Sequence, residues 1–170
     1  MTDSILTDAF EHHIWANERL LEACAALTPD QLDSGVPGIY GPIIETLRHL
    51  IQADSYYLWI FRGQTGERIA DDDQLSLDEL RAANERHAAG YRELLGGVLD
   101  PDAVVINHSD DGDFFSRLGV RLAQVPHHGT DHRSQVCTAL TNLGLTPPDI
   151  DLWAYGEVTG RTWDVVAASS

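Results

Sequence analysis

Hydrophobic positions recur at helical spacing in several long segments of the chain. The first segment runs from about residue 4 to residue 27 and ends at Thr28–Pro29, because a residue before proline is pushed out of helical geometry. The second segment runs from Pro42 to about Gly63. The third begins with the capping box Ser76–Glu79 and continues to residues 96–97. This spacing predicts three long helices in succession.

The pattern changes between residues 103 and 115. Residues 104–106 (Val-Val-Ile) form a short β-like run, and residues 110–113 (Asp-Asp-Gly-Asp) have the composition of a turn. We therefore expect a hairpin or an extended excursion at this point of the chain.

A fourth long helix is expected after the excursion. Ser116 is its predicted N-cap, and Gly144 is predicted to end it as a C-cap residue. Pro126 lies inside this helix and should kink it or remove one hydrogen bond. A short fifth helix is expected from Thr146 to about Glu157, and Trp163 is expected to dock on the bundle. Four long helices with one excursion and a short last helix are typical of an all-α, antiparallel four-helix bundle.

The composition fits one folded domain over residues 1–170, since 43% of the residues are hydrophobic. The net charge is −16, from 27 acidic and 11 basic side chains, so without a local arginine cluster we expect no nucleic-acid partner. No apolar run approaches the roughly 18 residues of a membrane helix, and no basic-then-apolar leader is present. We therefore expect a cytoplasmic protein without a membrane partner.

Two residue types exclude particular chemistries. All basic residues are arginine, so neither Schiff-base chemistry nor a lysine general base is available. The acid excess without lysine fits either a high-salt environment or an arginine-favouring genome. Cys24 and Cys137 lie far apart and outside any metal-binding spacing, so we expect two reduced thiols and no thiolate zinc site.

Among the eight histidines only His128 and His132 are spaced four residues apart. On a helix this spacing places both rings on one face, one turn apart, where they can hold one metal ion. In a chain with eight histidines such a pair is weak by itself. His49, however, lies among the apolar residues of the second helix, and a shared divalent cation would satisfy all three imidazoles. The alternative for His49 is a core histidine bonded to a neighbour.

Three motifs together resemble the DinB-like (YfiT-like) metalloenzymes, over all but about the last dozen residues. The motifs are His128-Gly-Thr-Asp-His132-Arg133-Ser-Gln135 on the last long helix, Trp15-Ala16-Asn17 on the first, and Thr46-Leu47-Arg48-His49-Leu50 with Trp59 on the second. The chain departs from the family pattern at Asp131 and Gln124, where relatives often have histidine, and at Ser134, where they often have glycine. None of these departures removes a candidate ligand.

The resemblance implies a four-helix bundle with a mononuclear metal site formed by His49, His128 and His132. Three neutral imidazoles would leave a divalent ion its full charge and at least one open position, which is the pattern of catalytic zinc sites. Zinc is the expected ion, with nickel, iron and manganese as alternatives. Glu45, one turn before His49, is a candidate base or orienting group, and Arg133 is a candidate for binding a substrate carboxylate.

Characterised relatives imply a metal-dependent S-transferase, in which the ion activates a low-molecular-weight thiol for attack on a small-molecule substrate. A hydrolase that uses metal-bound hydroxide is the alternative enzyme. A non-catalytic metal-binding protein, with a role in stress response or dimerisation, is the third interpretation. We also expect a homodimer, because Ile14 and Leu21 add apolar residues to the first helix.

Overall fold

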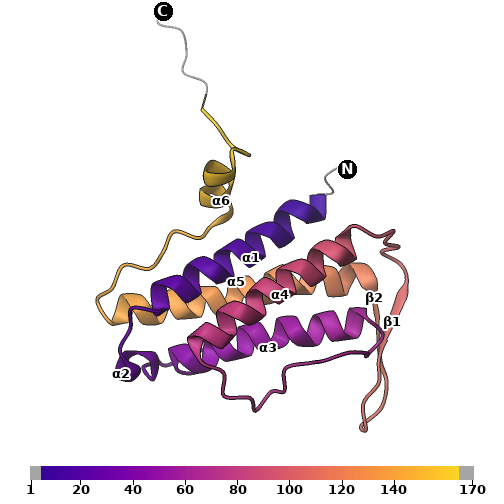
Figure 1. The fold of residues 1–170 in the computed structure, drawn as a ribbon, viewed down its shortest axis with the longest axis horizontal. Coiled ribbons are helices and arrows are strands. Elements are labelled where there is room, and N and C mark those ends of the chain that lie inside the picture. The colour runs from indigo at the N-terminus through magenta and orange to yellow at the C-terminus, as the bar shows by residue number, and fades with distance from the viewer. Residues whose placement is uncertain (1–4, 165–170) are drawn as a thin grey trace, which may run out of the picture.

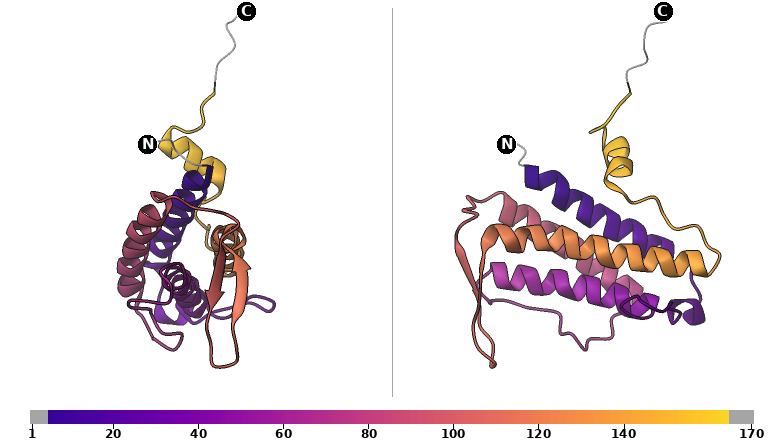
Figure 2. Two further views of the ribbon diagram at one scale, coloured as in Figure 1. Left: turned by 90° about the vertical axis from the view of Figure 1, so that its right-hand side faces the viewer. Right: turned by 180° about the vertical axis from the view of Figure 1, so that it is seen from behind.

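Four long helices dominate the fold in a computed structural model, which describes residues 5–164 (Figure 1). They are α1 (Ile5–Cys24), α3 (Ile43–Phe61), α4 (Leu77–Leu95) and α5 (Leu118–Asn142). Helices α1 and α3 each pack against both α4 and α5, and Figure 2 shows α5 running alongside α1 and α3. The expected all-α architecture is confirmed in its broad form, and each expected long helix is present.

The described residues also contain two short helices and one small sheet. The helices are α2 (Pro29–Leu32) and α6 (Leu152–Thr159), and the strands are β1 (Val104–Asn107) and β2 (Phe114–Arg117). The two strands pair in antiparallel register and lie at one end of the long helices (Figure 1). The predicted hairpin excursion is therefore confirmed.

Capping boxes start two of the helices. Ser76 accepts a hydrogen bond from the Glu79 amide and its own amide donates to the Glu79 carboxylate, as the sequence predicts for α4. Thr28 and Gln31 form an equivalent box at the start of α2, a helix that the sequence analysis does not predict. This second capping box explains why a new helix begins at Pro29.

Two predicted helix ends are shifted. Helix α1 ends at Cys24, earlier than the predicted residue 27, and its predicted start at residue 4 lies outside the described residues. The prediction that Ser116 caps α5 is wrong, because Ser116 belongs to β2. Arg117 occupies the N-cap position instead, without a capping hydrogen bond from its side chain. The strand therefore passes directly into the helix that carries the histidine pair.

The C-terminal part follows the expected order of elements with two corrections. Helix α5 continues without a break through Pro126 and ends before Gly144, whose φ of +75° favours glycine. Helix α6 begins later than the predicted Thr146, with Asp151 as its N-cap. It lies outside the long helices, next to α1 (Figure 1). Trp163 is exposed, so its predicted docking on the bundle is wrong.

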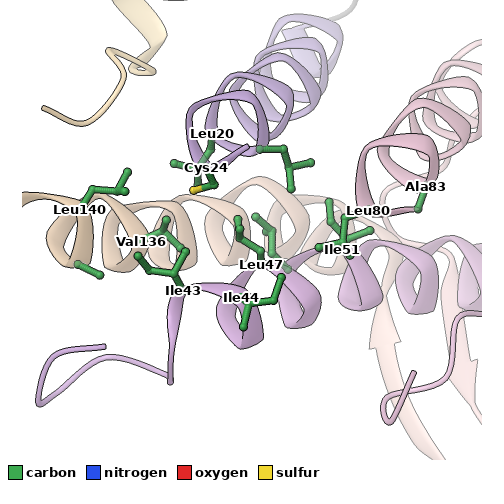
Figure 3. Close-up of a cluster of buried hydrophobic side chains, with 13 residues drawn as sticks. Leu20, Cys24, Ile43, Ile44, Leu47, Ile51, Leu80, Ala83, Val136 and Leu140 are labelled. Carbon is green, nitrogen blue, oxygen red and sulfur yellow. The ribbon is translucent and has the colours of Figure 1, made fainter. Parts of the chain in front are cut away.

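Two clusters of buried hydrophobic side chains fill the space between the long helices. Figure 3 shows the larger cluster, in which residues of α1, α3, α4 and α5 meet. Leu21 belongs to this cluster and is fully buried, and Ile14 packs against the smaller one. The chain's own core therefore uses the apolar residues from which we predicted a homodimer, and the homodimer stays a prediction. None of the helices within residues 5–164 combines the length and apolarity needed to cross a membrane.

Candidate metal centre

Three histidines from two helices form a compact cluster. His49 comes from α3, and His128 and His132 occupy successive turns of α5. The Nε2 atoms of His49 and His128 lie 3.1 Å apart, and one ring nitrogen from each histidine lies within 4.8 Å of the others. The structure thus brings together the three residues that the family resemblance implies as ligands.

Two observations indicate that the cluster could hold a divalent ion. At the 3.1 Å separation of the two Nε2 atoms, nitrogens each about 2.05 Å from one ion would subtend an angle of about 100°. Burial, followed by the charges of His132 and His49, lowers the pKa of His128 to about 4, and burial also lowers the pKa of His49. Both rings are therefore neutral at physiological pH and offer lone pairs to a cation.

Gln135 fixes the orientation of one ring in the cluster. The Nδ1–H of His132 donates to Oε1 of Gln135 at 3.0 Å, which leaves Nε2 of His132 as the available ligand atom. The same oxygen accepts a hydrogen bond from the backbone amide of Tyr40 at 3.1 Å. The Tyr40 ring stacks on His49, with centroids 4.2 Å apart, and meets His132 edge-on. One wall of the centre is therefore built from a loop that α5 holds in place.

Replacing Gln135 with alanine is expected to weaken metal binding by about 10- to 100-fold, because His132 loses the acceptor that fixes its ring and tautomer. The affinity is measured by competition between the protein and a chromogenic chelator for Zn²⁺ or Co²⁺. Thr138→Ala is the matched control, since Thr138 lies exposed on the same helix and bonds only to the backbone of its preceding turn. An unchanged affinity in Gln135→Ala would contradict this role.

A cavity of about 500 Å³ adjoins the cluster. Its walls combine ligand imidazoles, three tyrosines and polar side chains from α3 and the segment that follows it. The described residues that line it are Tyr40, His49, Gln52, Ala53, Tyr56, Tyr57, Arg68, Asp71 and His128. Burial raises the pKa of Tyr57, so its hydroxyl stays protonated at neutral pH. A small molecule in this cavity would meet the metal site directly.

A buried polar network links α1, α3, α4 and α5. Asp54 is fully enclosed and accepts hydrogen bonds from His13 Nε2, from Asn17 Nδ2 and from the hydroxyl of Tyr91. Burial alone would raise the pKa of Asp54, but its interactions with His13 and Tyr91 lower it below the ordinary value. The carboxylate is therefore charged inside the bundle and needs the network around it.

Arg133 supplies the opposite charge to this network. Its Nη1 donates to Nδ1 of His13 at 3.0 Å and to Oδ1 of Asn17 at 2.8 Å. Arginine only donates, so Nδ1 of His13 accepts and its Nε2–H points to Asp54. Arg133 is only 3% exposed and does not line the cavity beside the triad. This placement supports a role in holding α1 against α5. Arg133 also lines a second cavity of about 490 Å³, and its contact with a substrate carboxylate stays a prediction.

The remaining candidates from the sequence lie apart from the cluster. Glu45 accepts a hydrogen bond from Arg48 at 2.6 Å, and its proposed role as a base or orienting group stays a prediction. Three other histidines also lie outside the cluster. His12 bonds to the carbonyl of Ile150, and His127 is exposed. His87 is buried, because it lies on the inward face of α4.

Three residues shape the site without a sequence signal that would assign them a role. Tyr40, Tyr57 and Arg68 line the cavity, yet two of them come from irregular segments with no periodic signal. The sequence does carry a signal for the buried polar network, because Asp54 is a charged residue within the apolar stripe of α3. A charge at such a position predicts a buried partner, here His13.

Comparisons with known proteins place the chain in one family. No curated protein matches it. The model of the DinB family matches residues 1–165, which is nearly the whole chain, and the histidine cluster agrees with the metal site that the resemblance implies. The chain therefore belongs to the DinB family.

Proposed function

We propose that this protein is a metal-dependent transferase that joins the sulfur of a small thiol to an electrophilic substrate. Three clustered histidines beside a cavity of about 500 Å³ are the observation that supports it. A divalent ion held by His49, His128 and His132 would lower the pKa of a thiol or water molecule that it binds. Zinc is the proposed ion, because it suits nitrogen ligands and an open coordination position.

The protein's own residues supply position and polarity in this proposal. Gln135 orients His132, and Tyr40 covers one face of His49. Tyr57 keeps its proton and can donate a hydrogen bond to the leaving group of the substrate. The reaction forms a bond between the thiol sulfur and the electrophilic carbon. The bond to the leaving group breaks with its electron pair, and the thiol proton passes to solvent.

The first test is elemental analysis of protein purified without an affinity tag, since a histidine tag can load a foreign ion. The second follows the loss of 1-chloro-2,4-dinitrobenzene with and without a panel of low-molecular-weight thiols, and compares the protein with His128→Ala. The proposal requires about one equivalent of metal and a loss of the electrophile that depends on thiol, metal and His128.

Two other outcomes would replace this function. Metal-dependent cleavage of p-nitrophenyl acetate that needs no thiol would favour a hydrolase. Stoichiometric metal without either activity would favour a non-catalytic metal-binding protein. Protein without bound metal that also fails to take up added zinc would overturn all three interpretations of the histidine cluster.

A further inference from the structure

The cavity beside the histidines contains one cationic side chain. Arg68, from the connection between α3 and α4, is the sole arginine among the described residues that line it. This position is unusual in a chain with a net charge of −16, whose surface repels anions in general. A positive group beside a metal site marks the place where an anion would be attracted.

The backbone next to Arg68 is pinned to α3. The Ile69 amide donates to Oγ of Ser55 at 2.9 Å, and Nε2 of Gln52 donates to the Ala70 carbonyl at 3.0 Å. Ser55 and Gln52 are both buried. Arg68 therefore extends from a fixed segment, although this segment is neither helix nor strand.

Aromatic rings hold the guanidinium of Arg68. Its Cζ lies 5.4 Å from the ring centroid of Tyr56 and 5.6 Å from that of Trp59. Such cation–π contacts favour a flat guanidinium over the ring faces and leave its N–H groups at the edge. The side chain is 31% exposed, so it is partly desolvated but open to the cavity.

The donors of Arg68 are largely unused. Within residues 5–164 its guanidinium makes no hydrogen bond, and its one ion pair joins Nη2 to Oδ2 of Asp71 at 3.6 Å. The Asp71 side chain is 80% exposed, so this pair is weak and easily opened. A guanidinium has five N–H donors in a fork that matches a carboxylate. Arg68 is thus a cation with geometry for a ligand that residues 5–164 do not supply.

The geometry points to a carboxylate-bearing molecule as the occupant of this cavity, bound through its carboxylate by Arg68 while its other end reaches the histidine cluster. This inference rests on the proposed function for the identity of that other end, which is a thiol or a substrate carbon. A phosphate group is less suited, because a dianion beside Asp71 would have one arginine to balance it. Arg68 is therefore the specificity-determining residue of the site.

The test uses the full chain loaded with Co²⁺. Thiol binding is followed by the thiolate-to-cobalt absorption, for 3-mercaptopropionate and for its uncharged counterpart 3-mercaptopropionamide. Benzoate and benzamide, which contain no thiol, are titrated calorimetrically into the same proteins. The variants are Arg68→Gln and the matched control Arg19→Gln, in which a surface arginine paired with Glu22 is replaced.

We expect each carboxylate to bind at least about tenfold more tightly than its amide in the protein and in Arg19→Gln. Arg68→Gln should reduce this preference to less than about threefold without changing the affinity for Co²⁺. Asp71→Asn should increase the preference, because it removes the competing carboxylate.

Two failures are distinguishable. Equal binding of acid and amide, a preference that survives in Arg68→Gln, or inorganic phosphate that competes better than benzoate would overturn the inference and leave the metal-dependent function intact. Absence of Co²⁺ binding, or equal Co²⁺ binding in His128→Ala, would overturn the proposed function. The benzoate and benzamide titrations would then still decide the role of Arg68, since they require no metal.

Discussion

Alanine in place of His128 is expected to abolish stoichiometric metal binding. His128 contacts both other members of the cluster, with its Nε2 3.1 Å from that of His49 and its ring centroid 4.5 Å from that of His132. With only two imidazoles, most ligands of a divalent ion would be water molecules. The loss of a residue that hydrogen-bonds a ligand costs up to roughly 100-fold in metal affinity, and we expect the loss of a ligand itself to cost more. Elemental analysis and Zn²⁺ competition titration measure the change.

His127→Ala is the matched control for this variant. His127 is the neighbouring residue on α5, carries the same side chain, and is exposed away from the cluster. It should bind metal as tightly as the unmodified protein, and both variants should keep the helical circular dichroism spectrum. Full metal occupancy in His128→Ala would show that the ion binds at a different site.

Alanine in place of Gly129 is expected to destabilise the fold by about 3 kcal/mol, although glycine to alanine inside a helix ordinarily stabilises it. A Cβ at this position would overlap Nδ1 and Cε1 of His13 and would lie 2.6 Å from Nη1 of Arg133. The His13 ring cannot retreat, because it is fully buried and bonded to Asp54. The added methyl group must therefore open the buried network or push α5 away from α1.

Urea unfolding measures this effect as a fall in the free energy of unfolding. Gly41→Ala is the control, since its Cβ would meet only an ordinary contact, 3.7 Å from Cβ of Glu45. This control should change stability by less than about 0.5 kcal/mol. A neutral or stabilising Gly129→Ala would mean that His13 and Arg133 can move without cost, and the network would then not hold the helices together.

Helical periodicity predicts the pair His128 and His132, whereas the choice of His49 as the third candidate ligand comes from the family resemblance. His128 and His132 share a face of α5 whatever surrounds that helix, and His49 lies on the apolar side of α3. The hydrophobic pattern likewise predicts the four long helices, and the turn residues predict the hairpin. These features are local, so they can be read from residues that are close in the sequence.

The rest of the site depends on contacts between distant segments. Tyr40 reaches His49 because Gln135, 95 positions away, accepts its backbone hydrogen bond. Arg68 reaches the cavity because Ser55 and Gln52 tie down the segment that carries it. Neither pairing follows from periodicity, since side chains on other elements determine the path of an irregular segment.

Arg133 illustrates how a sequence motif leaves the direction of a side chain open. Its place next to a candidate ligand histidine suggests substrate binding, and this role stays a prediction. Successive helical positions, however, differ in direction by about 100°, and this rotation turns Arg133 toward His13 and Asn17 on α1. The arginine that lines the cavity beside His49 and His128 is Arg68.

The single amide oxygen of Gln135 joins the metal centre to the loop at its entrance. His132 and the backbone of Tyr40 both donate to it, so the order of the ring and the order of residues 33–42 depend on a common acceptor. Thermodynamic coupling of this kind is reciprocal. An ion that restrains His132 should also stabilise the ordered loop. A substrate that restrains the loop should in turn increase the affinity for the ion. If the proposed function holds, the protein should therefore retain its metal most strongly while a substrate occupies the entrance.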